Sequence, residues 1–186
     1  VATNTVSLPV AWRLYLSEVW ANDRARRTEA GVPDEIAFDT KPAIALKQIR
    51  AAVAVEIPRA PVLADAAYGT DTKFREGITE LGLPYVVGIQ PTVTVWKSGE
   101  GPLPKPAWKG TGRPPKLLPR SQKHPPVSVQ ELALALPTST WKKVTWRQGV
   151  KRSLSSRFAA VRVRPAHRDF ERSEPFPEER LLIEGP

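Results

Sequence analysis

The chain contains no cysteine and no methionine, and it has only two histidines, His124 and His167. The lack of cysteine excludes disulfides and cysteine-ligated zinc. Neither histidine has a second one at metal-ligand spacing or the partners of a catalytic triad, so we expect both at the surface or in loops. No apolar run reaches the length of a membrane span, and the N-terminus lacks the basic segment of a signal peptide. We therefore expect a cytoplasmic protein with no membrane partner.

Acidic residues are nearly absent from one contiguous stretch of the chain. Residues 92–168 contain sixteen Lys or Arg but only two Asp or Glu, a net charge of +14 within a total of +9. DNA favours such a block, because each cation that contacts a phosphate releases condensed counterions. The alternative is a solvated surface that only keeps the chain soluble, and we favour nucleic-acid contact over it.

The first half of the chain alternates apolar and polar segments. The stretch VSLPVAWRLYL at residues 6–16 predicts one or two short strands, and the polar stretch after it predicts one short helix. The apolar stripe of residues 42–56 predicts a longer helix, with Pro42 in its first turn and Pro58 beyond its end.

A second helix is predicted over residues 71–81, with Asp71 as its N-cap and Gly82 as its stop. Short apolar runs at residues 62–64 and 85–89 predict buried strands on either side of it. Helices that alternate with short apolar strands favour parallel pairing, so residues 1–90 are predicted to form an α/β domain.

The amino-acid composition of the chain changes after residue 90. Residues 91–127 contain nine prolines and a basic tract, which predicts an extended loop or linker. Residues 128–186 are predicted to form a separate, mostly β subdomain. Its elements are a helix at 128–136 and strands at 141–147, 158–164 and 180–184.

Asp65 is the strongest candidate for a functional residue. It follows the apolar run of residues 62–64, and a helix is predicted to begin after Gly69. Open α/β sheets bind ligands at the C-terminal ends of their strands, where a carboxylate can hold a divalent metal ion. The alternative is an Asp that only caps the following turn, and the local pattern leaves both interpretations open.

Several stretches together resemble the transposases of bacterial insertion sequences, which belong to the DDE endonuclease superfamily and have an RNase H-like core. The stretches are LPVAWRLYL, AGVPDEI, TKPAIALKQI, VLADAAYGTDTKFREGITELGLPYVVGIQPTVTVW, GTGRPPK, SRFAAVRVRPAHRDF and EERLLIEGP. The resemblance covers nearly the whole chain, although no single short motif supports it alone. It implies a partial RNase H-like core in residues 1–90, followed by a mostly β insertion region.

The resemblance also implies a mechanism. Three carboxylates hold two Mg²⁺ (or Mn²⁺) ions, which activate water or a 3′-OH and stabilise the leaving oxygen of a phosphodiester. Asp65 matches the second acid and is thus the expected catalytic residue and metal ligand. The first acid is expected upstream of Val1 and the glutamate downstream of residue 186. Glu184 ends a strand that the family places within its insertion, so we do not assign it to catalysis.

This chain is therefore expected to be an internal fragment of a transposase, one that neither holds the metal ions stably nor cleaves DNA. The stretch at residues 6–16 matches the second and third strands of the family's core. For the intact enzyme, the resemblance implies a homo-oligomer at the nucleoid that acts on transposon ends and target DNA.

DNA contacts are expected in the basic loop. Lys109, Arg113 and Lys116 are candidates for phosphate contact, and Trp108 is the candidate for stacking on bases. Core packing is the simpler interpretation for two further aromatic residues, Trp141 and Trp146. For Tyr68, DNA contact and packing beside the sheet remain equally open.

Two other functions remain open. A basic, non-catalytic nucleic-acid-binding module would bind phosphates through its cations and catalyse no reaction. An α/β hydrolase with Asp65 as nucleophile would need a further acid or Lys at a neighbouring strand end, and the sequence offers no convincing one.

Overall fold

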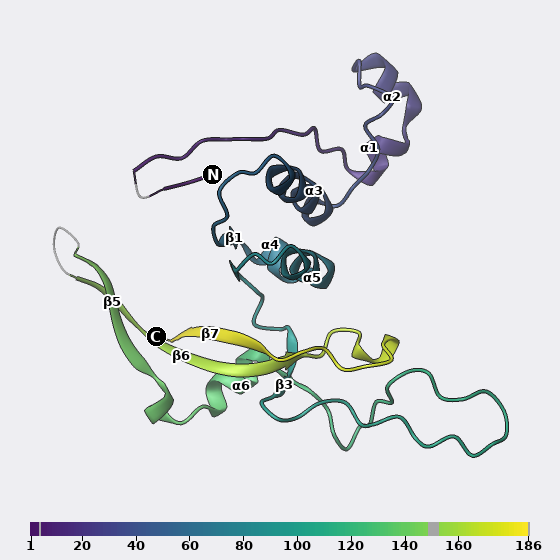
Figure 1. Ribbon diagram of the computed structural model, residues 1–186, viewed down its shortest axis with the longest axis vertical. Coiled ribbons are helices and arrows are strands. Elements are labelled where there is room, and N and C mark those ends of the chain that lie inside the picture. The colour runs from purple at the N-terminus through teal and green to yellow at the C-terminus, as the bar shows by residue number, and fades with distance from the viewer. Residues whose placement is uncertain (4, 149–152, 186) are drawn as a thin grey trace. The chain divides into compact units, whose positions relative to one another are not determined.

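The computed structural model describes residues 1–3, 5–148 and 153–185. The chain divides into two compact units, Val1–Ile89 and Gln90–Pro186, and each unit has a sheet of its own. Both units combine helices with strands (Figure 1). In the described ranges, no helix has the length and apolar character needed to cross a membrane.

The N-terminal stretch of the first unit is extended but forms no regular strand, so the prediction of strands at residues 6–16 is wrong. One isolated antiparallel bridge joins Ala2 and Ser7. Most of the apolar side chains here are exposed, and Trp12 is 86% exposed. High β-propensity describes a fit to a pleated surface, and this stretch has no neighbouring strand to pair with among the described residues.

Two short helices follow, where the sequence predicted one. They are α1 (Glu18–Asn22) and α2 (Arg24–Glu29). Asp23 separates them, because its side chain accepts a hydrogen bond from the backbone N–H of Arg26 at 3.1 Å and so caps α2.

The long helix predicted at residues 42–56 is confirmed as α3 (Lys41–Ala54). The Thr40 side chain caps it by accepting a hydrogen bond from the N–H of Ala43, and Pro42 lies in its first turn. Proline is tolerated there because the first N–H groups of a helix have no partner within it. Leu46 is the residue of α3 that is buried most completely in the core.

The second predicted helix is confirmed as α5 (Thr72–Glu80), with the expected residues at its ends. The Asp71 side chain accepts a hydrogen bond from the N–H of Phe74 at 2.9 Å, and Gly82 adopts the left-handed conformation (φ +65°) just beyond the helix. Helices α3 and α5 pack closely, because a Cβ atom on Gly77 would lie only 2.5 Å from Leu46 Cδ2. The core of this unit consists of Leu46, Phe74, Ile78 and Leu83.

The sheet of the first unit has two parallel strands, β1 (Val62–Ala64) and β2 (Tyr85–Val87), joined through the short helix α4 (Ala66–Gly69) and α5. The parallel pairing agrees with the α/β prediction. The prediction that both strands are buried is wrong, because one face of the sheet is exposed. Leu63 pairs with Val86, and these side chains are 75% and 62% exposed. Only the opposite face packs on the helices, through Val62, Ala64, Tyr85 and Val87.

The second unit is built on an antiparallel sheet with the strand order β4-β3-β6-β5. Strand β7 pairs with β6 as well and runs beside it in Figure 1. The strands are β3 (Thr94–Lys97), β4 (Val127–Ser128), β5 (Lys142–Gln148), β6 (Ser153–Pro165) and β7 (Glu179–Gly185). Three of these coincide with predicted strands. In contrast, β3 lies within the range that the sequence predicted to be loop, and β6 extends further in both directions than expected.

The predicted helix at residues 128–136 is confirmed as α6 (Val129–Ala135). It begins with a capping box, in which the Ser128 and Glu131 side chains each accept a hydrogen bond from the other residue's backbone N–H. These bonds satisfy two groups that the first turn leaves without partners. Two 3₁₀ turns complete the unit, Thr138–Thr140 and Asp169–Glu171.

Candidate functional site

Asp65 lies directly after β1, at the carboxyl end of a parallel strand. Its side chain is exposed and caps α4, since Oδ1 accepts a hydrogen bond from the N–H of Ala67 at 2.9 Å. The second carboxylate oxygen, Oδ2, has no hydrogen-bond partner in the part of the chain that the structure describes. The capping interpretation of Asp65 is therefore confirmed. The metal-ligand interpretation stays a prediction, and the free oxygen at a strand end is what supports it.

Two glycines hold the turn that carries Asp65. The N–H of Gly88, just after β2, donates to the carbonyl of Ala64 at 2.9 Å and continues the pairing of the two strands. A Cβ atom on Gly69 would lie 1.9 Å from the Gly88 carbonyl oxygen. Glycine has no side chain, so α4 can lie directly against the end of β2, where no larger residue fits between the two backbones. This contact orients the turn that carries Asp65.

A buried arginine lies beneath the same turn. Arg75 of α5 is only 8% exposed, and its Nη1 donates to the Gly69 carbonyl at 2.6 Å. Tyr68 packs its ring against Phe74, with the centroids 5.7 Å apart, and is half-buried. This contact favours the packing interpretation of Tyr68.

In the described ranges, the acidic side chains do not come together as a complete metal site. Among the described residues, no three His, Asp or Glu side chains lie close enough together to hold a metal ion. Glu184 belongs to the second unit, where it pairs with Phe158 across β7 and β6 and is exposed. Magnesium requires several oxygen ligands, so the Asp65 carboxylate alone does not fit a two-metal centre, and no metal-dependent step is assigned to the side chains present here.

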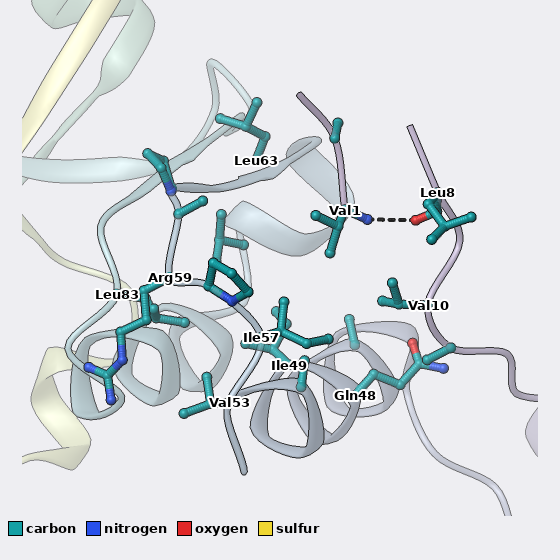
Figure 2. Close-up of a pocket in the computed structure, with 18 of the residues that line it drawn as sticks. Val1, Leu8, Val10, Gln48, Ile49, Val53, Ile57, Arg59, Leu63 and Leu83 are labelled. Atoms are coloured by element: carbon teal, nitrogen blue, oxygen red, sulfur yellow. Dashed lines mark hydrogen bonds between the residues drawn. The ribbon is translucent and has the colours of Figure 1, made fainter. Parts of the chain in front are cut away.

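An apolar groove of about 740 Å³ lies elsewhere in the first unit, between the N-terminal stretch, α3 and the segment before β1. Figure 2 shows Val10, Ile49 and Ile57 around it, with the N-terminal amino group of Val1 donating to the Leu8 carbonyl at 2.8 Å. Asp65 is not among the residues that line this groove. The groove therefore contributes nothing to the candidate acid site.

The four residues predicted to contact DNA are all exposed in the second unit. They are Trp108, Lys109, Arg113 and Lys116. The Trp108 indole N–H donates to the Gly112 carbonyl at 3.2 Å, and Gly110 and Gly112 both adopt positive φ angles. The tip of the loop is therefore a tight turn that holds Trp108, which is 54% exposed, beside the cations.

The C-terminal side of this loop is attached to the sheet by a buried carboxylate. Asp169 is fully buried and accepts hydrogen bonds from the Trp96 indole N–H at 2.8 Å and from Arg120 Nη2 at 3.2 Å. The His124 ring stacks on the Trp96 ring, with the centroids 4.8 Å apart. Thus His124 is half-buried at the base of the loop, whereas His167 is exposed as predicted.

Glu178 attaches the other side of the loop. Its carboxylate accepts hydrogen bonds from the backbone N–H of Gly99 at 2.8 Å and from Arg162 Nε at 3.1 Å. The Gly99 N–H is the main cause that lowers the pKa of Glu178, and Arg162 lowers it further. Neither anchor can be predicted from local sequence pattern, because each joins residues far apart along the chain.

Trp146 lies in β5 and Trp141 directly precedes that strand, and the two side chains differ in burial. Trp141 packs tightly in the sheet, since a Cβ atom on Gly185 would lie 2.6 Å from its ring. Trp146 is 55% exposed and contacts the Phe158 ring only edge-on, at 5.8 Å between centroids. Packing is thus the correct interpretation for Trp141, but Trp146 lies at a β-bulge that places it outside the core.

Comparison with known protein families matches residues 1–153 to a family described as DDE superfamily endonuclease. The match includes the whole first unit with Asp65, the basic loop and strand β5. No curated protein and no solved structure matches the chain.

Proposed function

Because this chain belongs to the DDE superfamily of endonucleases, we propose that it forms part of a transposase that cleaves DNA and joins the ends to a target. Endonucleases of this superfamily generally use divalent metal ions and act on DNA. The observation that links this function to a residue is the position of Asp65, an exposed carboxylate with a free oxygen at the carboxyl end of a parallel strand.

In this proposal, Asp65 is one of the carboxylates that hold Mg²⁺ or Mn²⁺ in the intact enzyme. Strands β1 and β2, with α3 and α5, belong to an RNase H-like core. The remaining acids come from outside these 186 residues, because no described cluster of acids includes Asp65. The metal ions supply activation of the nucleophile and stabilisation of the leaving oxygen. The chain's own contribution is to orient one carboxylate through the Gly69–Gly88 contact.

The proposed partner is DNA, as transposon ends and as target, bound by an enzyme that acts at the nucleoid as a homo-oligomer. Lys109, Arg113 and Lys116 supply cations for the phosphates, and Trp108 supplies an aromatic surface. All four side chains are exposed on a loop whose two sides are attached to the sheet through Asp169 and Glu178.

The decisive experiment compares two aspartates in the intact enzyme that contains this chain. Asp65→Asn is expected to abolish Mg²⁺-dependent cleavage of transposon ends, because a neutral amide is a poor metal ligand. Asp71→Asn is the matched control, since Asp71 also caps a helix and lies six residues away along the same chain. Loss of cleavage only in Asp65→Asn supports the proposal, and equal activity of the two variants contradicts it.

The alternative is a non-catalytic DNA-binding module, and a second assay tests whether the 186-residue chain cleaves DNA by itself. The strongly basic second unit favours that alternative. The 186-residue chain by itself is expected to bind DNA without cleaving it above background in Mg²⁺ or Mn²⁺. Cleavage by this chain that Asp65→Ala abolishes would show that the site is complete within it. If Asp65→Asn instead leaves the intact enzyme fully active, the binding-module alternative is favoured.

A further inference from the structure

The ribbon formed by β5 and β6 has two chemically different faces. Residues that pair across antiparallel strands project to the same side, and successive residues alternate between sides. Lys143 pairs with Arg157, and Thr145 pairs with Ser155, so these four residues share one face. All four are exposed. We call them the Lys143 face.

The other face of the ribbon is more apolar. Lys142 pairs there with Phe158, and Val144 pairs with Ser156. Trp146 lies beside Phe158, and Val144 is 44% exposed. The Lys143 face therefore differs from its opposite face in carrying only cations and hydroxyl groups.

The pairing of Lys143 with Arg157 places two positive charges directly opposite each other. Side chains in such a pair have Cβ atoms about 4.5–5.5 Å apart, and like charges at this distance destabilise a sheet. Neither side chain has an ion pair or hydrogen bond within the described ranges. The hydroxyls of Thr145 and Ser155 likewise have no hydrogen-bond partner there. The face thus presents two cations and two hydroxyl donors to solvent.

Elsewhere in the same sheet, a similar pairing is neutralised by an acid. Arg162 pairs with Arg180 across β6 and β7, but Arg162 also forms a 3.1 Å ion pair with Glu178. Arg164, two residues along β6, lies within 3.8 Å of the same carboxylate. No acid occupies the corresponding position beside Lys143 and Arg157 in the described part of the chain, so the charge there is free to meet an external anion.

We propose that the Lys143 face is a second DNA-contacting surface, separate from the loop that carries Lys109, and that it binds backbone phosphates. The inference rests on the proposed function, which supplies DNA as the partner. Lys143 and Arg157 together neutralise a phosphate that lies between them, and Thr145 and Ser155 donate hydrogen bonds to the next one.

The geometry of the ribbon fits an extended polyanion better than a single anion. The pair Lys143–Arg157 and the pair Thr145–Ser155 are two residues apart on the same strands, about 7 Å along the ribbon. A nucleic-acid backbone running along the ribbon can therefore present successive phosphates to successive pairs. The hydroxyls and cations read no base, so the contact sets position and affinity rather than sequence preference.

The test is a salt-titrated binding measurement with the 186-residue chain and a short duplex DNA of unrelated sequence, between about 50 and 200 mM salt. Lys143→Gln and Arg157→Gln should each flatten the log–log salt dependence. The double variant should flatten it by about 0.9 and weaken binding on the order of tenfold near 0.1 M salt, because the two cations neutralise one phosphate. Lys142→Gln is the matched control, since it removes the same charge from the adjacent residue on the opposite face, and its slope should equal that of the parent chain.

A second pair of changes uses different chemistry. Thr145→Val with Ser155→Ala should weaken binding severalfold and leave the salt slope unchanged, because hydroxyls displace no counterions. Melting temperatures provide a check on folding, since Lys143→Gln relieves a repulsion and should not lower the melting temperature of the free chain. A DNA-induced rise in melting temperature should be smaller for Lys143→Gln than for the parent chain.

Three outcomes overturn the inference, and they differ in what they imply for the proposed function. If Lys142→Gln flattens the slope as much as Lys143→Gln, net charge and not this face controls binding. If Lys109→Ala flattens the slope but Lys143→Gln and Arg157→Gln do not, the loop alone contacts DNA and the proposed function stands. If the parent chain shows no salt-dependent DNA binding at all, both this surface and the DNA contacts of the proposed function are rejected.

Discussion

The indole N–H of Trp96 donates to the buried carboxylate of Asp169 at 2.8 Å, although 73 positions separate the two residues in the chain. Trp96 belongs to β3, and Asp169 begins the 3₁₀ turn after β6. Arg120, at the end of the basic loop, reaches the other carboxylate oxygen at 3.2 Å. One acid thus joins the sheet, the turn and the loop.

Replacing Asp169 should destabilise the second unit. Asp169→Ala leaves the Trp96 indole N–H buried without an acceptor, and it removes the partner of Arg120. We expect a loss of about 2–3 kcal/mol in the free energy of unfolding, because a buried donor without a partner carries its full desolvation penalty while the half-exposed Arg120 can be solvated again. Chemical denaturation followed by tryptophan fluorescence measures this loss.

Glu171→Ala is the control for that measurement. Glu171 lies in the same 3₁₀ turn, but its pair with Arg168 is 3.9 Å long and both side chains are more than half exposed. Surface pairs of this kind contribute less than about 1 kcal/mol. If Glu171→Ala and Asp169→Ala destabilise the chain equally, burial of the Asp169 carboxylate is not what stabilises the loop anchor.

The close contact between Gly69 and Gly88 predicts a steric effect in the first unit. Gly69→Ala would place a methyl group 1.9 Å from a backbone carbonyl oxygen, so α4 must shift away from β2. We expect a loss of about 3 kcal/mol or more in the free energy of unfolding, at or above the upper end of overpacking costs. Gly101→Ala should cost less than about 1 kcal/mol, because its methyl group meets only the flexible Arg164 side chain at 3.3 Å. Equal losses for Gly69→Ala and Gly101→Ala would show that Gly69 and Gly88 do not lie as close together as this structure places them.

Lowering the pH should reduce the contribution that Glu178 makes to the free energy of unfolding. The Gly99 N–H and Arg162 lower the pKa of this carboxyl below its usual value of 4.5. A lowered folded-state pKa gives a contribution to stability that is complete above pH 4.5 and is lost as the pH falls through the folded-state pKa. The free energy of unfolding should therefore fall more steeply below pH 4.5 for the parent chain than for Glu178→Gln. Parallel curves for the two proteins would exclude this linkage.

Local signals predicted the two longer helices of the first unit, α3 and α5. The caps Thr40 and Asp71 and the stop at Gly82 each act on backbone groups within four residues, so the sequence contains the whole interaction. The same holds for Asp65, since its place after an apolar run and its capping bond are both local. Its proposed metal-binding role depends on other acids, and no local pattern can show which ones meet it.

Pairing between distant segments could not be predicted from local pattern. The stretch at residues 6–16 has strand composition, yet a strand needs a neighbour, and the only bridge among the described residues here joins Ala2 to Ser7. Leu63 and Val86 are apolar enough for a buried strand, but only one face of the two-stranded sheet is covered. Trp146 was expected in a core because alternation does not reveal a β-bulge, which shifts every following side chain.

The basic loop should bind DNA even where catalysis is absent. Lys109, Arg113 and Lys116 are exposed on a tip held by Gly110 and Gly112, so their charges are available to phosphates without a large rearrangement. Changing all three to Ala should flatten the log–log salt dependence of duplex binding by up to about three units, if each contacts a phosphate. Asp65→Ala should leave that slope unchanged, since it removes no cation. Salt-titrated anisotropy with the 186-residue chain measures both.

The alternative is that these cations only keep a proline-rich loop solvated, and the two cases differ in salt dependence and not merely in affinity. A solvated loop releases no counterions on binding, so the triple variant would then match the parent chain at every salt concentration. Trp108→Ala gives an independent measure, because it removes the exposed ring without changing the charge. It should weaken binding to single-stranded DNA more than to duplex, since a paired and stacked base offers no free face to the indole. An equal effect on both forms would mean that Trp108 shapes the loop through its bond to Gly112 and does not contact bases.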